Sequence, residues 1–269
     1  MNRSNTNRKK IADKLIDYLE ARINCDNVLN YTSQYATDED DNILIIDNFP
    51  VALNVVEYND NQDYHSTQLS DKKDNTEIKK MYEIFDFMVE SNYTGFEYFP
   101  YLYGVLDCHD SDRSRIYIYR ENFEADITKL IASIDHPSDW YDVVFQIIMI
   151  DDYVKNISKY DYKPNVINFL YNKLSKPFYK EYTFGETKLN INHKYLIVLW
   201  DYESINTNPS ETAKSNLDFL LEYINEKQSN IRVQPSNRII KMINNIKNDP
   251  TNLSSIIIKY YGPTEPAVS

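Results

Sequence analysis

Cysteine and histidine are the residue types of this chain that most often bind metals or act as nucleophiles. The sequence holds two cysteines and four histidines, and their spacing matches no zinc-binding pattern. The spacings that a serine hydrolase or a dinucleotide-binding loop requires are also absent. Because no signal peptide opens the sequence, we expect Cys25 and Cys108 to be reduced intracellular thiols.

Phosphate binding through a glycine-rich loop is excluded as well. The chain has only 4 glycines, at positions 95, 104, 185 and 262, and no two of them are close in sequence. Asn168 and Asp201 stand at the ends of expected strands. Asparagine and aspartate are common in turns at such places, so these two residues taken alone indicate no chemistry.

Hydrophobic periodicity predicts a strand-rich first half and a helix-rich second half, which is an α+β pattern with a break at residues 120–124. Helices are expected at 10–23, 76–90, 127–134, 140–155, 215–227 and 238–247. Strands are expected at 42–46, 51–58, 98–107, 114–120, 168–173, 181–184, 188–191 and 195–202. We also expect the helix at 145–150 to pack against the strand at 196–200 and the helix at 217–221, because all three are apolar.

Charge limits the classes of partner. The formal net charge is -12, which disfavours binding to nucleic acid or to an anionic membrane surface. The cluster Arg8-Lys9-Lys10 is short and stands at the start of an expected helix, so we expect it to face solvent. The longest apolar run, near 196–200, is far too short for a membrane span.

Five segments, taken in chain order, resemble the motifs of protein kinases. They are 51–54 for the lysine-bearing strand, 75–78 for the helix with the partner glutamate, 117–123 for the strand and hinge of the adenine pocket, 168–171 for the end of the catalytic loop, and 196–203 for the strand before the metal-binding aspartate. Segments 99–104, 145–148 and 192–201 resemble the divergent serine/threonine protein-kinase-like proteins of large nucleocytoplasmic DNA viruses.

This resemblance implies that parts of a phosphotransfer site have been lost. A kinase uses a lysine to position the phosphates and a loop aspartate to take the substrate proton. By position, Asn54 replaces the lysine and Lys163 replaces the aspartate. If the loop holds two extra residues, Asp161 could itself be the base, with Lys163 beside the γ-phosphate.

Other positions keep the residue types that the family requires. Asn168 and Asp201 match the two Mg²⁺ ligands, and Glu77 matches the helix glutamate. The resemblance implies that Asn54, Glu77 and Glu121 line the nucleotide cleft. Glu77 is equally explained as a first-turn helix residue that faces the positive end of the helix dipole.

The expected fold is therefore α+β, a protein-kinase-like two-lobed fold with a reduced C-lobe, divided into residues 1–121 and 122–269. The expected function is that of a pseudokinase, a catalytically impaired kinase-like binding or structural module, which could be a minor component of a large DNA virus particle. No cofactor is expected for such a module. Its partners would be virion or host proteins, and it would reside in the host cytoplasm or in the particle.

Two alternatives stay open. An active atypical serine/threonine kinase would bind Mg-ATP and use Asp161, Asn168 and Asp201. An α+β structural or interaction protein unrelated to kinases would make the motif series a coincidence.

Overall fold

The computed structural model describes residues 5–30, 36–37, 40–58, 98–109, 114–156, 161–162, 169–200, 205–206 and 215–262. The chain divides into an N-terminal unit, residues 3–123, and a C-terminal unit, residues 124–269. The boundary follows Phe123, whereas sequence analysis placed it after Glu121. Helices and mainly antiparallel sheets occur together, so the α+β fold class is confirmed.

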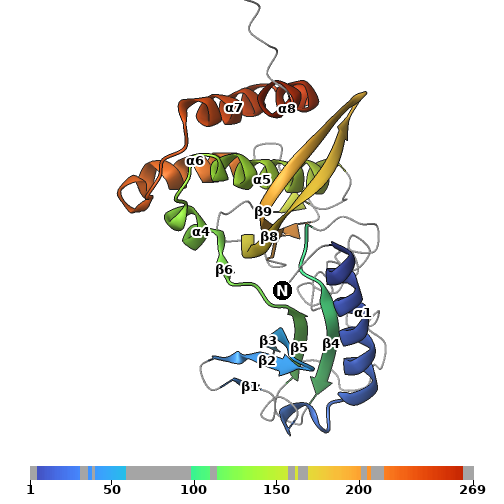
Figure 1. Cartoon of the computed structure of the whole chain (residues 1–269). Coiled ribbons are helices and arrows are strands. Elements are labelled where there is room, and N and C mark those ends of the chain that lie inside the picture. The colour runs from blue at the N-terminus through green and yellow to red at the C-terminus, as the bar shows by residue number, and fades with distance from the viewer. Residues whose placement is uncertain are drawn as a thin grey trace, which may run out of the picture. The chain divides into compact units, whose positions relative to one another are not determined.

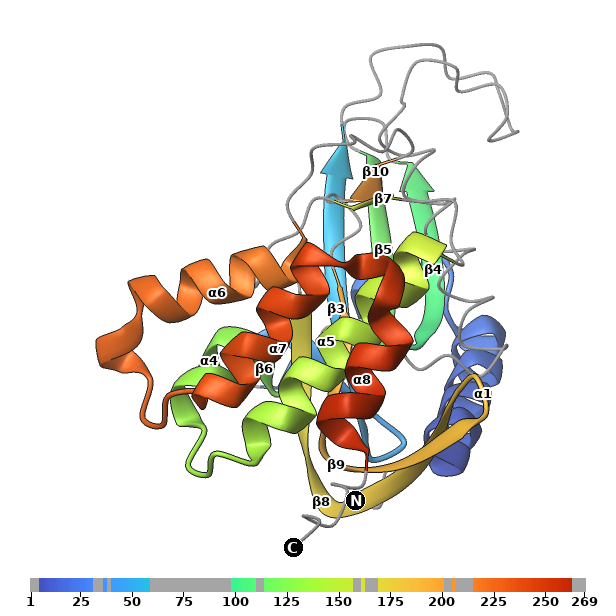
Figure 2. The same ribbon diagram turned by 90° about the horizontal axis from the view of Figure 1, so that it is seen from above.

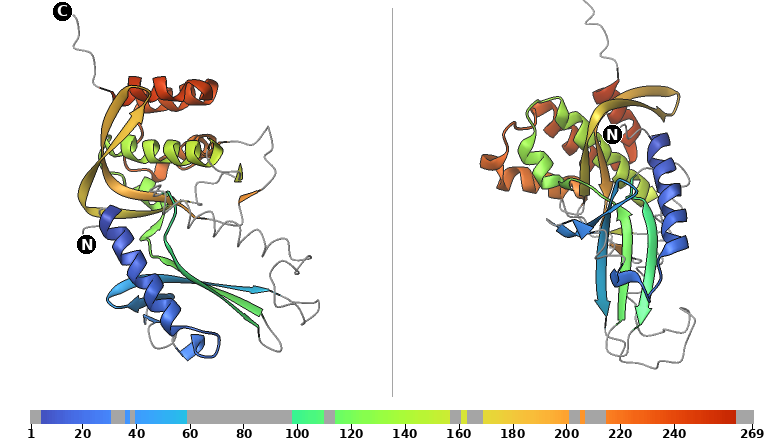
Figure 3. Two further views of the ribbon diagram at one scale, coloured as in Figure 1. Left: turned by 90° about the vertical axis from the view of Figure 1, so that its right-hand side faces the viewer. Right: turned by 60° about the horizontal axis from the view of Figure 1, so that its bottom comes forward.

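The N-terminal unit is an antiparallel sheet with a helix beside it. Its elements are α1 (Asn5–Arg22), β1 (Ala36–Thr37), β2 (Asp40–Ile46), β3 (Phe49–Tyr58), β4 (Leu102–His109) and β5 (Ser114–Glu121). The strand order is β1-β2-β3-β5-β4. Strands β3, β5 and β4 lie side by side, and α1 runs along β4 (Figure 1 and Figure 3, right).

A tight hairpin connects β2 to β3. Asp47 and Asn48 form its two-residue turn, and both have positive φ, at 51° and 66°. Aspartate and asparagine tolerate this left-handed conformation better than other residues with side chains, and it suits the twist of a two-residue hairpin. The turn fixes the register, so that Ile46 pairs with Phe49 and Leu44 with Val51.

The core of the N-terminal unit forms where α1 meets the sheet. Ala12, Leu15 and Leu19 recur at helical spacing on α1 and are at most 1% exposed. They contact side chains that alternate along the strands and share one face of the sheet. That face comprises Leu44, Ile46, Val51, Leu53, Tyr101, Tyr103, Tyr117 and Tyr119.

A disulfide joins α1's C-terminal side to the sheet. Cys25, just beyond α1, is bonded to Cys108 on β4, and their Cα atoms are 5.5 Å apart. The prediction of two reduced thiols is therefore wrong. Residues so far apart in sequence become neighbours because α1 and β4 pack together.

The C-terminal unit combines helices with a long β-hairpin. Its elements are β6 (Ala125–Asp126), α4 (Ile127–Ser133), α5 (Asp139–Asn156), β7 (Asp161–Tyr162), β8 (Phe169–Phe184), β9 (Thr187–Leu199), β10 (Ile205–Asn206), α6 (Asn216–Glu226), α7 (Asn237–Asn248) and α8 (Leu253–Tyr261). Strands β6, β8 and β9 form one sheet, and β7 pairs with β10 in another. The β8-β9 hairpin curves past α5 and α8 (Figure 2).

The β8-β9 ladder has a break near its middle. Lys173 pairs with Tyr195, and the next pair is Phe178 with His193, so extra residues of β8 bulge out between them. Sequence analysis predicted separate short strands at 168–173 and 181–184, whereas β8 is one continuous strand. The exposed lysines and Pro177 obscured the strand pattern here, because a bulge tolerates residues that a regular ladder does not.

The predicted core of the C-terminal unit is confirmed. Helix α5 packs against β9 and α6. Phe145 and Ile148 of α5, Ile197 of β9 and Leu220 of α6 are at most 2% exposed.

Helix α8 was not predicted from the sequence. Helix α8 contains a run of three isoleucines, 256–258, and β-branched residues of this kind favour strands. Tertiary packing outweighs that preference, because Ile256, Ile257 and Tyr260 recur on one helical face and are buried.

Candidate functional site

The predicted metal and catalytic residues fall mostly outside the described part of the chain. Glu77, Lys163, Asn168 and Asp201 lie outside it. Asp161 is described through its backbone alone, as the first residue of β7.

Two strand pairings involve described residues that are close in sequence to Asn168 and Asp201. Phe169, next to Asn168 in sequence, pairs with Leu199, which stands two positions before Asp201. Asp161 pairs with Asn206, five positions after Asp201. Paired strands place such partners only about 5 Å apart. The two pairings belong to different sheets, so each brings together only its own two segments: Phe169 with Leu199, and Asp161 with Asn206.

Asn54, expected to line a nucleotide cleft, is engaged by an arginine. It lies on β3, and its Oδ1 accepts a hydrogen bond of 2.9 Å from Nε of Arg120 on β5. Arg120 also donates to the backbone oxygen of Glu121 at 3.0 Å. Burial lowers the pKa of Arg120 to about 10, although Glu121 and Tyr103 oppose that shift, so the guanidinium stays charged at neutral pH. Arg120, on the strand next to that of Asn54, therefore supplies a positive charge at this part of the sheet.

Glu121 forms a buried ion pair with Arg8 of α1. Nε of Arg8 donates to both carboxylate oxygens, at 2.8 and 3.1 Å, and Nη2 of Arg8 lies 2.6 Å from Oε2. The two side chains are 2% and 8% exposed. The carboxylate of Glu121 therefore holds α1 against the end of β5.

Arg8 makes two further contacts. Its Nη2 donates to the backbone oxygen of Phe99 at 2.6 Å, and its guanidinium lies over the ring of Tyr101 at 4.4 Å. The prediction that Arg8 faces solvent is wrong. Lys9 and Lys10, next to Arg8 in the sequence, are exposed as expected, so the residues around Arg8 do not indicate that Arg8 itself is buried.

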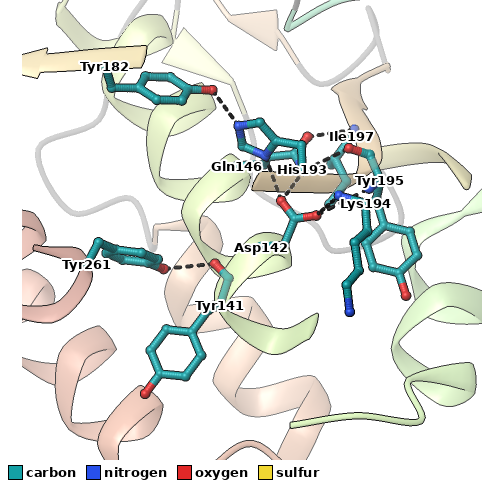
Figure 4. Close-up of polar contacts among 9 residues, drawn as sticks. All are labelled: Tyr141, Asp142, Gln146, Tyr182, His193, Lys194, Tyr195, Ile197 and Tyr261. Carbon is teal, nitrogen blue, oxygen red and sulfur yellow. Dashed lines mark hydrogen bonds and ion pairs between the residues drawn. The ribbon is translucent and has the colours of Figure 1, made fainter. Parts of the chain in front are cut away.

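A second polar cluster, which sequence analysis missed, lies in the C-terminal unit (Figure 4). Asp142 of α5 is 5% exposed and sits at its centre. Its Oδ1 lies 2.7 Å from Nδ1 of His193, and its Oδ2 accepts from the backbone N–H groups of Lys194 at 2.7 Å and Tyr195 at 3.2 Å. These two backbone N–H groups belong to residues that follow His193 at the break in the β8-β9 ladder. The Asp142 carboxylate therefore accepts hydrogen bonds from β9 where the ladder is irregular.

Gln146, one helical turn after Asp142, continues this contact along β9. Its Nε2 donates to Asp142 Oδ1 at 2.7 Å and to the backbone oxygen of Tyr195 at 3.1 Å. Its Oε1 accepts from the backbone N–H of Ile197 at 2.9 Å. Because β9 has β8 on one side only in its sheet, the Gln146 amide takes the place of a neighbouring strand.

The hairpin is tied to the same cluster. Nε2 of His193, which is 1% exposed, lies 2.9 Å from the hydroxyl of Tyr182 on β8. The ring of Phe145 stacks edge-on against Tyr182 and Tyr261. The Tyr261 hydroxyl donates to the backbone oxygen of Tyr141 at 2.9 Å (Figure 4). Burial raises the pKa of Tyr261 well above its ordinary value, so this hydroxyl keeps its proton.

The chemistry of this cluster is structural. Asp142 and Gln146 direct their polar atoms at backbone groups of β9, at His193 and at each other. Within the described ranges, no group of three or more histidine, cysteine or acidic side chains could hold a metal ion. A sequence signal did exist: Asp142 and Gln146 stand four residues apart within a helix whose residues between them, 143–145, are all apolar.

Helix α6 begins with a capping box. The Ser215 hydroxyl accepts from the backbone N–H of Asp218, and the Asp218 carboxylate accepts from the backbone N–H of Ser215 at 2.8 Å. Lys247 of α7 forms an ion pair with Asp218. Burial alone would raise the pKa of Asp218, but the hydrogen bonds from Lys247 and Ser215 outweigh it and lower the pKa below its ordinary value.

Similarity to known proteins extends over both units. The uncharacterized protein R691 of Acanthamoeba polyphaga mimivirus is 48% identical over 272 residues, which cover 95% of this chain and 99% of R691. No family model matches the chain. Each helix in the described ranges is too short or too polar to span a lipid bilayer. At this identity and coverage, the chain belongs to the same protein family as mimivirus R691.

Proposed function

We propose that this protein is a pseudokinase, a catalytically impaired relative of protein kinases that serves as a binding or structural module. The observation that carries the proposal is the pairing of Phe169 with Leu199 and of Asp161 with Asn206. Because Phe169 follows Asn168 and Leu199 precedes Asp201 by two positions, the first pairing suits a site in which Asn168 and Asp201 face one ion, while Asp161 stands on the separate strand β7. The proposed fold is accordingly two-lobed, with a reduced C-lobe formed by the C-terminal unit.

The arrangement around Asn54 supports impaired catalysis. A phosphotransferase needs a cation on this strand to position the α- and β-phosphates. Asn54 carries no charge, and its amide oxygen is bonded to Arg120. Glu121 is likewise engaged, by Arg8. Both residues thus contribute to the packing of the N-terminal unit.

A role in the virus particle agrees best with the other observations. The related R691 is a protein of Acanthamoeba polyphaga mimivirus. The Cys25–Cys108 disulfide suits a protein that resides in a particle, because cytosolic disulfides are rare whereas virion surfaces retain them. The proposed partners are other virion proteins or host proteins. Nucleic acid is disfavoured by the net charge of -12.

Nucleotide binding tests the proposal directly. We expect no change in melting temperature when purified protein is titrated with Mg-ATP. A bound ligand at a hundred times its Kd would stabilise the folded state by about 2.7 kcal/mol, which such a titration detects easily. A clear shift that Asp201→Ala removes would instead show a working nucleotide site.

The second candidate is an active atypical serine/threonine kinase, which the pairing of Asp161 with Asn206 favours. It predicts Mg-ATP-dependent autophosphorylation that is lost in Asp161→Asn and in Asp201→Ala. Absence of phosphate incorporation in the wild-type protein would remove this candidate.

The third candidate is an α+β interaction protein unrelated to kinases. An experimental structure separates it from the other two, since metal ligands lie about 2.0–2.6 Å from their ion. Side chains of Asn168 and Asp201 more than about 10 Å apart could not share one ion, and the kinase relationship would then fail.

A further inference from the structure

The two cysteines lie at the C-terminal side of α1 in an accessible position. Cys25 is exposed, and Cys108 on β4 is half-buried. They are the only two cysteines of the chain, so the disulfide has no competing intramolecular partner. A sulfur that reaches solvent can be attacked by a thiol or can itself attack a small disulfide.

Helix α1 is held at both ends by different chemistry. Near its start, Arg8 is bound to Glu121 in a buried ion pair. Just beyond its end, Cys25 is bonded to Cys108. Between these two attachments, Ala12 and Leu15 in the middle of the helix and Leu19 in its last turn pack into the core. Besides the main chain, the disulfide is the covalent link between the segment that follows α1 and the sheet, and together with the packing of Leu19 it holds the C-terminal turns of α1 against β4.

We propose that Cys25 and Cys108 form a reversible redox site, whose oxidised state locks the C-terminal turns of α1 onto β4 and whose reduced state releases them. The oxidant is a low-molecular-weight disulfide, and the reductant is a dithiol. The site acts on the N-terminal unit alone and does not depend on the pseudokinase assignment.

The oxidation proceeds by thiol–disulfide exchange. The thiolate of the exposed Cys25 attacks one sulfur of the small disulfide, forms a mixed disulfide and displaces one small thiolate. The thiolate of Cys108 then attacks the Cys25 sulfur, forms the protein disulfide and displaces the second small thiolate. The protein loses two protons and two electrons, and the small disulfide becomes two small thiols.

Alkylation followed by intact-mass measurement tests the redox site. We expect folded protein that has been oxidised with a small disulfide to accept no alkyl group after denaturation. Protein treated with dithiothreitol should accept two, and re-oxidation of the folded protein should restore the unlabelled mass as a monomer. Two alkyl groups on the oxidised sample, or re-oxidation only to disulfide-linked dimers, would overturn the proposal.

Hydrogen exchange tests the release of α1. After reduction of the folded protein, we expect loss of amide protection at the C-terminal turns of α1, where the N–H of Ile23 donates to the backbone oxygen of Leu19. Protection near Arg8 and along α5 should stay unchanged. Because the chain has no other cysteine, the reductant can act through no other bond.

A double variant supplies the matched control. Cys25→Ser with Cys108→Ser should show the exchange pattern of the reduced wild-type protein and should not respond to reductant. If the double variant fails to fold, the reduced wild-type protein still tests the proposal, because its disulfide is reduced only after the protein has folded. Equal protection of α1 in oxidised and reduced wild-type protein would show that the disulfide locks nothing.

Discussion

Single residues show how strongly the N-terminal unit depends on a buried charge. We expect Arg8→Ala to lower the free energy of unfolding by about 3–5 kcal/mol, because it leaves the Glu121 carboxylate buried without its cation. Denaturant unfolding measures the change. Lys10→Ala is the matched control: this nearby cation on the same helix is exposed, and its removal should cost less than about 0.5 kcal/mol. Adding Glu121→Gln to Arg8→Ala should restore part of the loss, since the unpaired charge disappears.

Asp218 gives the C-terminal unit a defined response to acid. Its pKa is lower in the folded protein than the ordinary value of 3.8, so its charged form stabilises the fold. That contribution is fully present above the unfolded-state pKa and is lost as pH falls through the folded-state pKa. We expect wild-type protein to be more stable than Asp218→Asn at neutral pH, with the difference shrinking below about pH 4. Unfolding free energies of both proteins across this range test it, and a difference that grows on acidification would contradict the lowered pKa.

Among the elements, α5 and β9 are joined by Asp142 through several hydrogen bonds at once. We expect Asp142→Asn to lower the melting temperature markedly, because one acceptor atom is replaced by a donor that faces N–H groups. Glu226→Gln, the same type of change at an exposed helix position, should have almost no effect. Equal melting temperatures for the two variants would mean that the hairpin needs no anchor on α5.

Apolar packing between the same elements gives a second prediction. Ile148→Ala and Leu220→Ala each remove a side chain that is at most 2% exposed, so each should cost about 2–5 kcal/mol. Leu29→Ala is the control, since Leu29 is 59% exposed. Thermal unfolding and soluble yield report the effect, and a cost below about 1 kcal/mol at both core positions would place the core elsewhere.

The elements themselves were largely predictable, and the contacts between them were not. The apolar period of 140–155 predicted α5, which spans Asp139–Asn156, and the alternation of 114–120 predicted β5. Helix α8 escaped because its isoleucines favour strands in isolation. Arg8 resembled a solvated cation, and only the fold around it shows that Glu121 requires it. Hydrophobic periodicity predicts helices and strands because these depend on residues that are close in sequence. A contact with a residue far along the chain does not change that local pattern, so it could not be predicted.

At the scale of the whole molecule, the proposed function predicts that the stability of the fold does not depend on the residues of the predicted nucleotide cleft. We expect Asn168→Ala and Asp201→Ala to leave the melting temperature within about 1 °C to 2 °C of wild type, since a binding module holds its fold by packing and not by a nucleotide. Co-sedimentation with virus particles or with isolated virion proteins should also be unchanged. Loss of co-sedimentation in a folded variant would show that the cleft is used. The Ile148→Ala protein serves as the control for association lost through unfolding.

The disulfide has a topological consequence for the molecule. Cys25 and Cys108 close a covalent ring that contains β1, β2, β3 and most of β4. Closing a ring of this length restricts the unfolded chain by about 4–5 kcal/mol in the chain-entropy account. A protease that cuts the main chain once anywhere inside the ring cannot release either piece, because the sulfur bridge still joins them. On a gel without reductant the nicked protein would therefore run as one chain, and addition of reductant would split it into two fragments that both begin or end at the same cut.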